Sequence, residues 1–152
     1  MISERQKEAW NAATGMLARR EHSRQELIRK LTSRHYEVAL IDDVLDQLVK
    51  SGYQSDERFT GHYIRFRSGK GYGPSRIRME LVEKGVDETI IQQGLDHADI
   101  DWLELAESVR GKKFKGQVAD TWEERGRQKK FLDYRGFTRE QIQHCINGDE
   151  FD

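Results

Sequence analysis

The chain has 152 residues, of which 35% are charged and 36% hydrophobic, and its formal net charge at pH 7 is −1. This charge gives no bulk attraction to nucleic acid or membranes, and three Trp, five Tyr and six Phe argue against disorder. A single proline favours helix almost throughout, because proline interrupts helices. The sequence therefore predicts an all-α protein.

The predicted helices begin at the N-terminus with an amphipathic segment over residues 4–20. Ser23 is a good N-cap for the next helix, and Glu26, three residues later, completes a capping box. A further helix carries Ile41 and Leu45 on its apolar face. This part of the chain is predicted to form a unit of three short helices.

The middle of the chain repeats that pattern. Residues 56–68 predict a helix whose apolar stripe includes Phe66. Pro74 stands where a first-turn proline opens a helix, and Gly85 is placed to end it in the left-handed conformation. Asp87 then caps the next helix.

The last third of the chain shows the same elements again. A helix is predicted over residues 101–113, and Arg135-Gly136 is typical of a helix end with glycine in the left-handed position. Thr138 is the expected N-cap of the final helix.

Alignment of the chain with itself indicates three divergent repeats. Residues 23–48 match residues 73–98 at an offset of 50, and residues 127–146 match the second copy at an offset of 51. The matched positions are mostly apolar or glycine. We therefore expect three tandem three-helix repeats, at residues 4–54, 55–100 and 101–148, stacked as an elongated, curved array.

Charge is segregated along the chain. Residues 65–84 carry six basic and two acidic side chains, residues 85–109 carry no Lys or Arg, and residues 110–130 carry eight basic and three acidic side chains. The two basic blocks are interpreted as a surface that follows phosphates or meets an acidic partner. The alternative is that they are ordinary solvated helix faces.

Catalytic and cofactor chemistry is not indicated. The run from Gly69 to Gly73 lacks the spacing of a phosphate-binding loop and follows no strand. The five histidines are scattered singly, so no metal site is expected. Cys145 lies between core-facing positions and is interpreted as a packed residue. A lone cysteine and the absence of a long apolar run predict a cytoplasmic protein without a membrane segment.

Several stretches together resemble the RecX family of bacterial recombination regulators. They are REHSRQELIRKL from Arg20, the GY-SDERF run from Gly52, KGYGPSRIRMELVEKGV from Lys70, DIDW from Asp99 and KKFLDYRGFTREQI from Lys129. The resemblance covers nearly the whole chain, and the central KGYGPxRI block is specific to that family. The segment between Lys113 and Arg125 lacks a family motif.

This resemblance implies a negative modulator of RecA that acts without chemistry. Such a protein binds the RecA–single-stranded-DNA filament in its helical groove or at its ends. It blocks filament extension and reduces recombinase activity, ATP hydrolysis and LexA cleavage. It is expected to be a monomer that touches single-stranded DNA weakly, within the filament. The competing hypothesis is a stand-alone DNA-binding helical repeat module.

The partner-binding residues follow from the basic blocks together with the resemblance. They are expected to be Arg65, Arg67, Lys70, Tyr72, Arg76, Arg78, Arg127, Lys129 and Lys130. In this hypothesis the cations meet an acidic RecA surface or DNA phosphates, and Tyr72 provides an aromatic contact. The structural alternative is that residues 70–74 are only a turn, that Tyr72 packs between helices, and that the arginines are surface residues.

Overall fold

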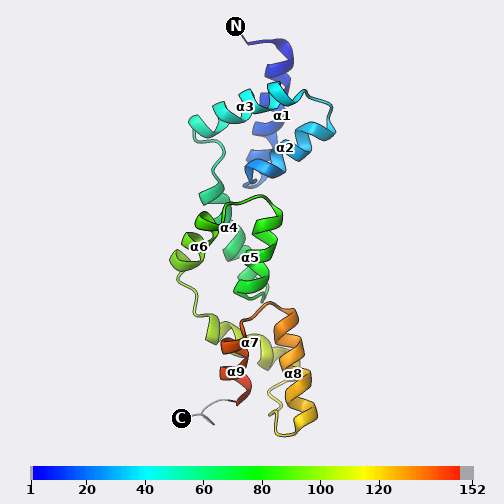
Figure 1. Ribbon diagram of the computed structural model, residues 1–152, viewed down its shortest axis with the longest axis vertical. Helices are drawn as coiled ribbons and strands as arrows, with labels where there is room; N and C mark the ends of the chain where they lie inside the picture. The colour runs from blue at the N-terminus through cyan, green and yellow to red at the C-terminus, as the bar shows by residue number, and fades with distance from the viewer. Residues whose placement is uncertain (1, 148–152) are drawn as a thin grey trace. The chain divides into compact units, whose positions relative to one another are not determined.

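The computed structural model describes residues 2–147, and every regular element in that range is an α-helix (Figure 1). The helices are α1 (Glu4–Arg19), α2 (Arg24–Ser33), α3 (Val38–Lys50), α4 (Asp56–Gly69), α5 (Pro74–Glu83), α6 (Glu88–His97), α7 (Trp102–Phe114), α8 (Trp122–Tyr134) and α9 (Arg139–Asn147). The all-α prediction is confirmed. The expected boundary at residue 148 lies outside the described residues.

The local signals for helix ends are present as predicted. Ser23 accepts a hydrogen bond from the backbone N–H of Glu26, whose side chain accepts one from the backbone N–H of Ser23. Pro74 is the first residue of α5. Gly85 and Gly136 have φ of +81° and +93°, so both occupy the left-handed region that only glycine adopts without strain.

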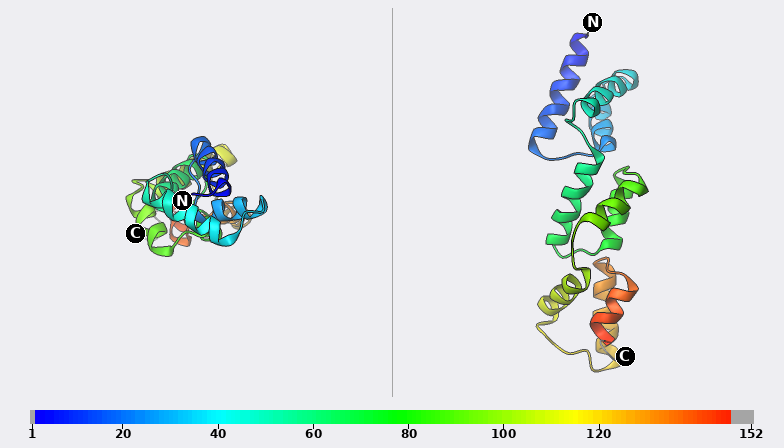
Figure 2. Two further views of the ribbon diagram at one scale, coloured as in Figure 1. Left: turned by 90° about the horizontal axis from the view of Figure 1, so that it is seen from above. Right: turned by 90° about the vertical axis from the view of Figure 1, so that its left-hand side faces the viewer.

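The first repeat has a core of aliphatic side chains between α1, α2 and α3, which lie together in Figures 1 and 2. Ala9 and Ala13 are fully buried on α1, and small residues there let the other two helices approach closely. Trp10 is partly buried and meets Tyr53 edge to face, with ring centroids 5.5 Å apart.

The third repeat packs α7, α8 and α9 around a smaller core. Leu132 and Ala106 are fully buried, and Phe137 and Ile142 nearly so. Cys145 is buried in the same cluster. Burial raises the pKa of its thiol to about 12, and a hydrogen bond with Glu107 acts in the same direction, so the sulfur stays protonated at neutral pH.

The chain divides into two compact units, which among the described residues are 2–62 with 81–94 and 63–80 with 95–147. The middle repeat, α4 to α6, is shared between them, so each unit contains one junction between repeats. In the first unit the hydroxyl of Ser23 donates to the carbonyl of Lys84, at 2.8 Å. The Nζ of Lys84 lies 3.5 Å from a carboxylate oxygen of Glu26.

The second unit contains the corresponding junction at equivalent repeat positions. The backbone N–H of Gly73 donates to the carbonyl of Arg135 at 2.8 Å, and that of Ser75 to the carbonyl of Gly136 at 2.9 Å. A β-carbon on Gly73 would lie 2.6 Å from the backbone of Gly136, and one on Gly136 would collide with Arg76. Two backbones therefore touch where only glycine fits.

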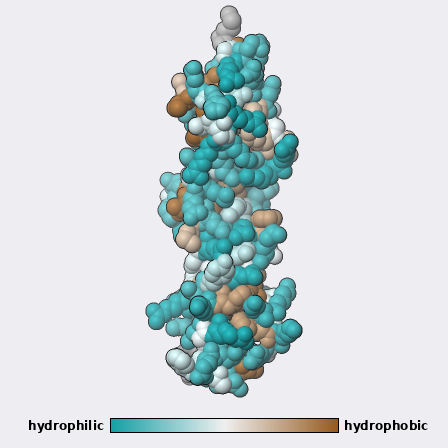
Figure 3. Space-filling view, turned by 90° about the vertical axis from the view of Figure 1, so that its right-hand side faces the viewer, coloured by the Kyte–Doolittle hydropathy of each residue, from teal (hydrophilic) through white to brown (hydrophobic). Residues whose placement is uncertain are grey.

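Phe66 was predicted to join the apolar stripe of α4, but this residue is 60% exposed, so that prediction is wrong. The Nζ of Lys70 lies 5.2 Å from the centre of the Phe66 ring. The face drawn in Figure 3 is largely hydrophilic, with hydrophobic residues in scattered groups. None of the described helices is long and apolar enough to cross a bilayer.

Replacing Gly136 with alanine tests the close approach at the second junction. A β-carbon there would lie 2.7 Å from the backbone nitrogen of Arg76. The left-handed backbone conformation of residue 136 would strain an alanine as well. We expect the free energy of unfolding to fall by about 2 kcal/mol or more, measured by urea denaturation.

The matched control is Gly126→Ala in the preceding helix, α8, where a β-carbon meets nothing within 4 Å. This change should raise the free energy of unfolding by about 0.5–1 kcal/mol, because alanine favours helix over glycine. Equal stability of the two variants would show that the junction is not closely packed.

Candidate functional site

Glu80 on α5 is the centre of a polar cluster in the second unit. Its Oε1 accepts hydrogen bonds from the hydroxyl of Tyr63 and the Nε of Arg67, both at 2.9 Å. Its Oε2 accepts from the Nη2 of Arg67 at 2.9 Å and from the Nε of Arg76 at 3.3 Å. Arg67 therefore binds the carboxylate with two parallel hydrogen bonds, the strongest geometry for this pair.

The ion pair of Arg67 and Glu80 is largely shielded from water. Their side chains are 18% and 19% exposed. Burial raises the pKa of Glu80, but hydrogen bonds from Arg67, Tyr63 and Arg76 outweigh it, so the pKa lies below its ordinary value. The pKa of Arg67 is raised, chiefly by its hydrogen bonds to Glu80. Both groups are charged at neutral pH.

Tyr72 lies among three guanidinium groups. The Cζ atoms of Arg67, Arg76 and Arg135 are 3.9, 4.6 and 5.0 Å from the centre of its ring. Arg135 is fixed further by its Nη1, which donates to the carbonyls of Lys70 at 3.2 Å and Gly71 at 3.4 Å. The aromatic ring thus separates and stabilises cations that would otherwise repel one another.

The predicted residues of the basic stretch fall into two groups. Arg67, Tyr72 and Arg76 come together with Glu80 and are half-buried. Arg65 and Lys70 are exposed. Arg76 and Arg78 on α5 are both half-buried. Arg76 also donates to the carbonyl of Tyr134, at 3.1 Å.

The predicted basic residues of the third repeat are also separated. Arg127 binds Glu124 on its own helix, at 2.9 Å, and its guanidinium lies 4.9 Å from the centre of the Phe114 ring. Lys129 and Lys130 instead line an open hollow of about 450 Å³ together with Arg139. These two lysines are better placed than Arg127 to meet a partner.

The sequence analysis missed Glu80 and Arg135. The spacing of Arg76 and Glu80, four residues apart on one helix, is a usable signal for an ion pair. Arg135 approaches Tyr72 across 63 residues of chain (135 − 72). That contact follows from the repeat junction, which no local pattern reveals.

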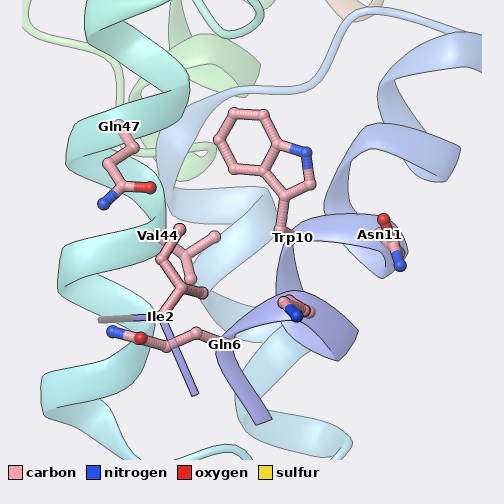
Figure 4. A pocket seen from close by; sticks show the side chains of 7 residues that line it. Ile2, Gln6, Trp10, Asn11, Val44 and Gln47 are labelled. Carbon is pink, nitrogen blue, oxygen red and sulfur yellow. The ribbon is translucent and has the colours of Figure 1, made fainter. Parts of the chain in front are cut away.

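The first repeat carries a separate cavity of about 300 Å³ between α1 and α3 (Figure 4). Ile2, Trp10 and Val44 give it an apolar wall, and Gln6, Asn11 and Gln47 lie at its edges. Of the described residues that line it, Lys7 alone is charged. Such a lining suits an apolar contact and offers no acid–base pair.

Among residues 2–147, His, Cys, Asp and Glu side chains form no group of three or more that could hold a metal ion.

Replacing Glu80 with glutamine tests whether the carboxylate holds the cluster together. At neutral pH we expect the free energy of unfolding to fall by about 1–2 kcal/mol, because charge-assisted hydrogen bonds become neutral ones. The native pKa of Glu80 is below its ordinary value of 4.5, so its contribution is complete above that value. It is lost as the pH falls through the native pKa.

Urea denaturation at several pH values should therefore show the wild type and Glu80→Gln converging in acid. Glu83→Gln, an exposed change on the same helix, serves as the control and should follow the wild type throughout. A difference for Glu80→Gln that stays constant from neutral to acidic pH would contradict the assignment.

Comparison with known proteins gives a family match for each of the three helical repeats. Family models described as the first, second and third three-helix domains of RecX match residues 9–48, 55–95 and 99–146. The regulatory proteins RecX of Pseudomonas putida (strain GB-1) and of Pseudomonas entomophila (strain L48) are each 43% identical to this chain. The matches span 140 and 136 residues, which are 92% and 90% of this chain and 90% and 88% of those proteins.

Solved structures agree on the fold. The crystal structure of RecX from Lactobacillus salivarius superimposes with a TM-score of 0.82 at 21% identity, covering 99% of this chain and all of that one. A second crystal structure, of regulatory protein RecX, gives 0.80 at 19% identity, covering 95% of this chain and 72% of that one. Three domain matches in order, together with relatives at 43% identity, show that this chain belongs to the RecX family of regulatory proteins.

Proposed function

We propose that this chain is a negative modulator of RecA that binds the RecA–single-stranded-DNA filament and limits its extension. The observation that carries the proposal is membership of the RecX family across all three domains. Recombinase activity, ATP hydrolysis and LexA cleavage would fall together, because all three need the filament. The protein would act through binding free energy alone.

The repeat organisation supports a filament partner. A filament presents the same surface at regular intervals, and tandem repeats present related surfaces at regular intervals along one chain. The helical repeats here are similar in backbone but differ in charge, as the two junctions show. A single chain could therefore contact successive protomers or bridge a protomer and the DNA beside it.

The exposed cations are the best candidates for partner contact. Arg65, Lys70 and Lys130 are exposed, so they can form new ion pairs without losing internal ones. Arg67 and Arg76 are already bound to Glu80. These two would act by holding the surface in shape, and Tyr72 would do the same by stacking between them.

Charge reversal of the exposed cations tests this proposal. ATP hydrolysis by preformed RecA filaments is measured while the wild type or the triple variant Arg65→Glu/Lys70→Glu/Lys130→Glu is titrated in. We expect the triple variant to need a concentration about tenfold higher or more for half-inhibition, because charge reversal across an interface is repulsive.

The matched control reverses three exposed arginines of the first repeat, Arg19, Arg29 and Arg34. It changes the net charge by the same amount and should inhibit like the wild type. Equal loss by both variants would mean that overall charge matters and not this surface. Failure of the wild type to inhibit would sink the proposal. Inhibition by far fewer chains than RecA protomers would favour action at filament ends.

A stand-alone DNA-binding module is the competing function. It predicts tight binding to naked single-stranded DNA with a steep dependence on salt concentration. The RecA modulator predicts weak binding to naked DNA and tight binding to the filament. Fluorescence anisotropy of a labelled oligonucleotide, with and without RecA, separates the two functions.

A further inference from the structure

A second hollow lies beside the repeat junction of the second unit. Its volume is about 330 Å³, within the range of small-ligand sites. The end of α4 and the turn after it, one side of α7 and the end of α8 form its walls. Its lining residues are Gly69, Lys70, Gly71, Leu105, Ser108, Val109, Lys112, Lys113, Phe131 and Arg135.

Glycine keeps this hollow open. Gly71 has φ of +88°, and a β-carbon there would lie 3.0 Å from the Nη1 of Arg135 and 3.1 Å from a methyl carbon of Val109. Any larger residue would push the guanidinium aside. Gly71 thus makes room for a cation that comes from the third repeat.

Among the described residues, the lining carries no carboxylate and four cations: Lys70, Lys112, Lys113 and Arg135. Within residues 2–147 none of the four has an acidic side chain at ion-pair distance, whereas Arg67 and Arg76 nearby share Glu80. Positive charge concentrated in a concave site attracts anions more strongly than the same charge spread over a convex surface.

Arg135 is already held in position for such a ligand. Its Nη1 binds two backbone carbonyls, and its guanidinium stacks on Tyr72 and on Phe131, 5.1 Å from the centre of the second ring. Its Nε and Nη2 hydrogens have no acceptor among the described residues. A guanidinium fixed in this way loses little conformational entropy when its remaining edge binds an oxyanion.

We propose that this hollow is a binding site for a ligand with two or more neighbouring phosphate groups. Such a ligand brings several negative charges into a small volume, as four neighbouring cations require. A single carboxylate would leave most of the positive charge unbalanced. Phe131 is covered by Arg135 and by the Nζ of Lys113, at 5.5 Å, so the site recognises phosphate and offers no free ring for a base.

The phosphates could come from a free polyphosphate or from the backbone of a single nucleic-acid strand, and both are tested without RecA. Tripolyphosphate is titrated into the full chain at low salt by calorimetry, and a labelled oligothymidylate is followed by anisotropy. We expect one saturable tripolyphosphate site per chain. Competition between the two ligands identifies the strand as a source, and binding of tripolyphosphate alone identifies a free polyphosphate.

The test variant is Lys112→Gln/Lys113→Gln, which changes two exposed residues. We expect tripolyphosphate binding to weaken about tenfold or more, because two charge-assisted contacts are lost. For the oligonucleotide, the salt slope should fall by about 1.4 if both lysines contact phosphates. The matched control, Arg29→Gln/Arg34→Gln, removes the same charge from exposed residues of the first repeat and should bind like the wild type.

Three results would overturn the proposal. They are the absence of saturable tripolyphosphate binding, equal weakening by both double variants, and displacement of tripolyphosphate by an equal concentration of oligoglutamate. Because RecA is absent from these measurements, their failure would leave the proposed modulation of RecA standing. Failure of RecA inhibition would likewise leave this site intact.

Discussion

The structure depends on a close approach between segments of the chain, which glycine makes possible, at each junction between repeats. At the second junction Gly73 and Gly136 meet so closely that a β-carbon on either would collide with the segment that carries the other. At the first junction Gly85 has the same role, and a β-carbon there would lie 2.5 Å from that of Gln25. Gly85 and Gly136 each also end a helix in the left-handed conformation. One residue therefore both stops a helix and docks a repeat, which explains why glycine recurs at this point of the repeat.

The same geometry carries different chemistry at the two junctions. Glu26 pairs with Lys84 in the first, whereas the equivalent positions in the second are Arg76 and Arg135. The first junction thus has a carboxylate paired with an ammonium group, where the second has two guanidinium groups. Tyr72 between them, Glu80 beside Arg76, and the carbonyls of Lys70 and Gly71 on Arg135 stabilise this arrangement. His22 occupies the position of Tyr72 in the first repeat and is 2% exposed. Divergence of the repeats thus created a positively charged surface on an unchanged backbone plan.

Sequence patterns predicted the fold well because its determinants are local. The capping box at Ser23, the proline at the start of α5 and the glycines after α5 and α8 each depend on neighbouring residues. The site was predicted only in part. Composition identified the basic stretch, but the pairing of Arg67 with Glu80 joins two helices, and the contact of Arg135 with Tyr72 joins two repeats. Charge counts cannot distinguish an arginine that is already bound from one that is free to bind.

That distinction decides how the basic surface can work. To meet an acidic partner, Arg67 would have to give up two hydrogen bonds to Glu80 and leave that shielded carboxylate with only Tyr63 and Arg76 as donors, at a cost that can exceed the gain from the new contact. Lys70, Lys112 and Lys113 lose no ion pair on binding. The arginines are thus best suited to hold the junction rigid, and the lysines to bind. A rigid junction matters for the lysines as well, because Lys70 and Lys112 lie on segments of different repeats and share one hollow while the junction keeps those segments together.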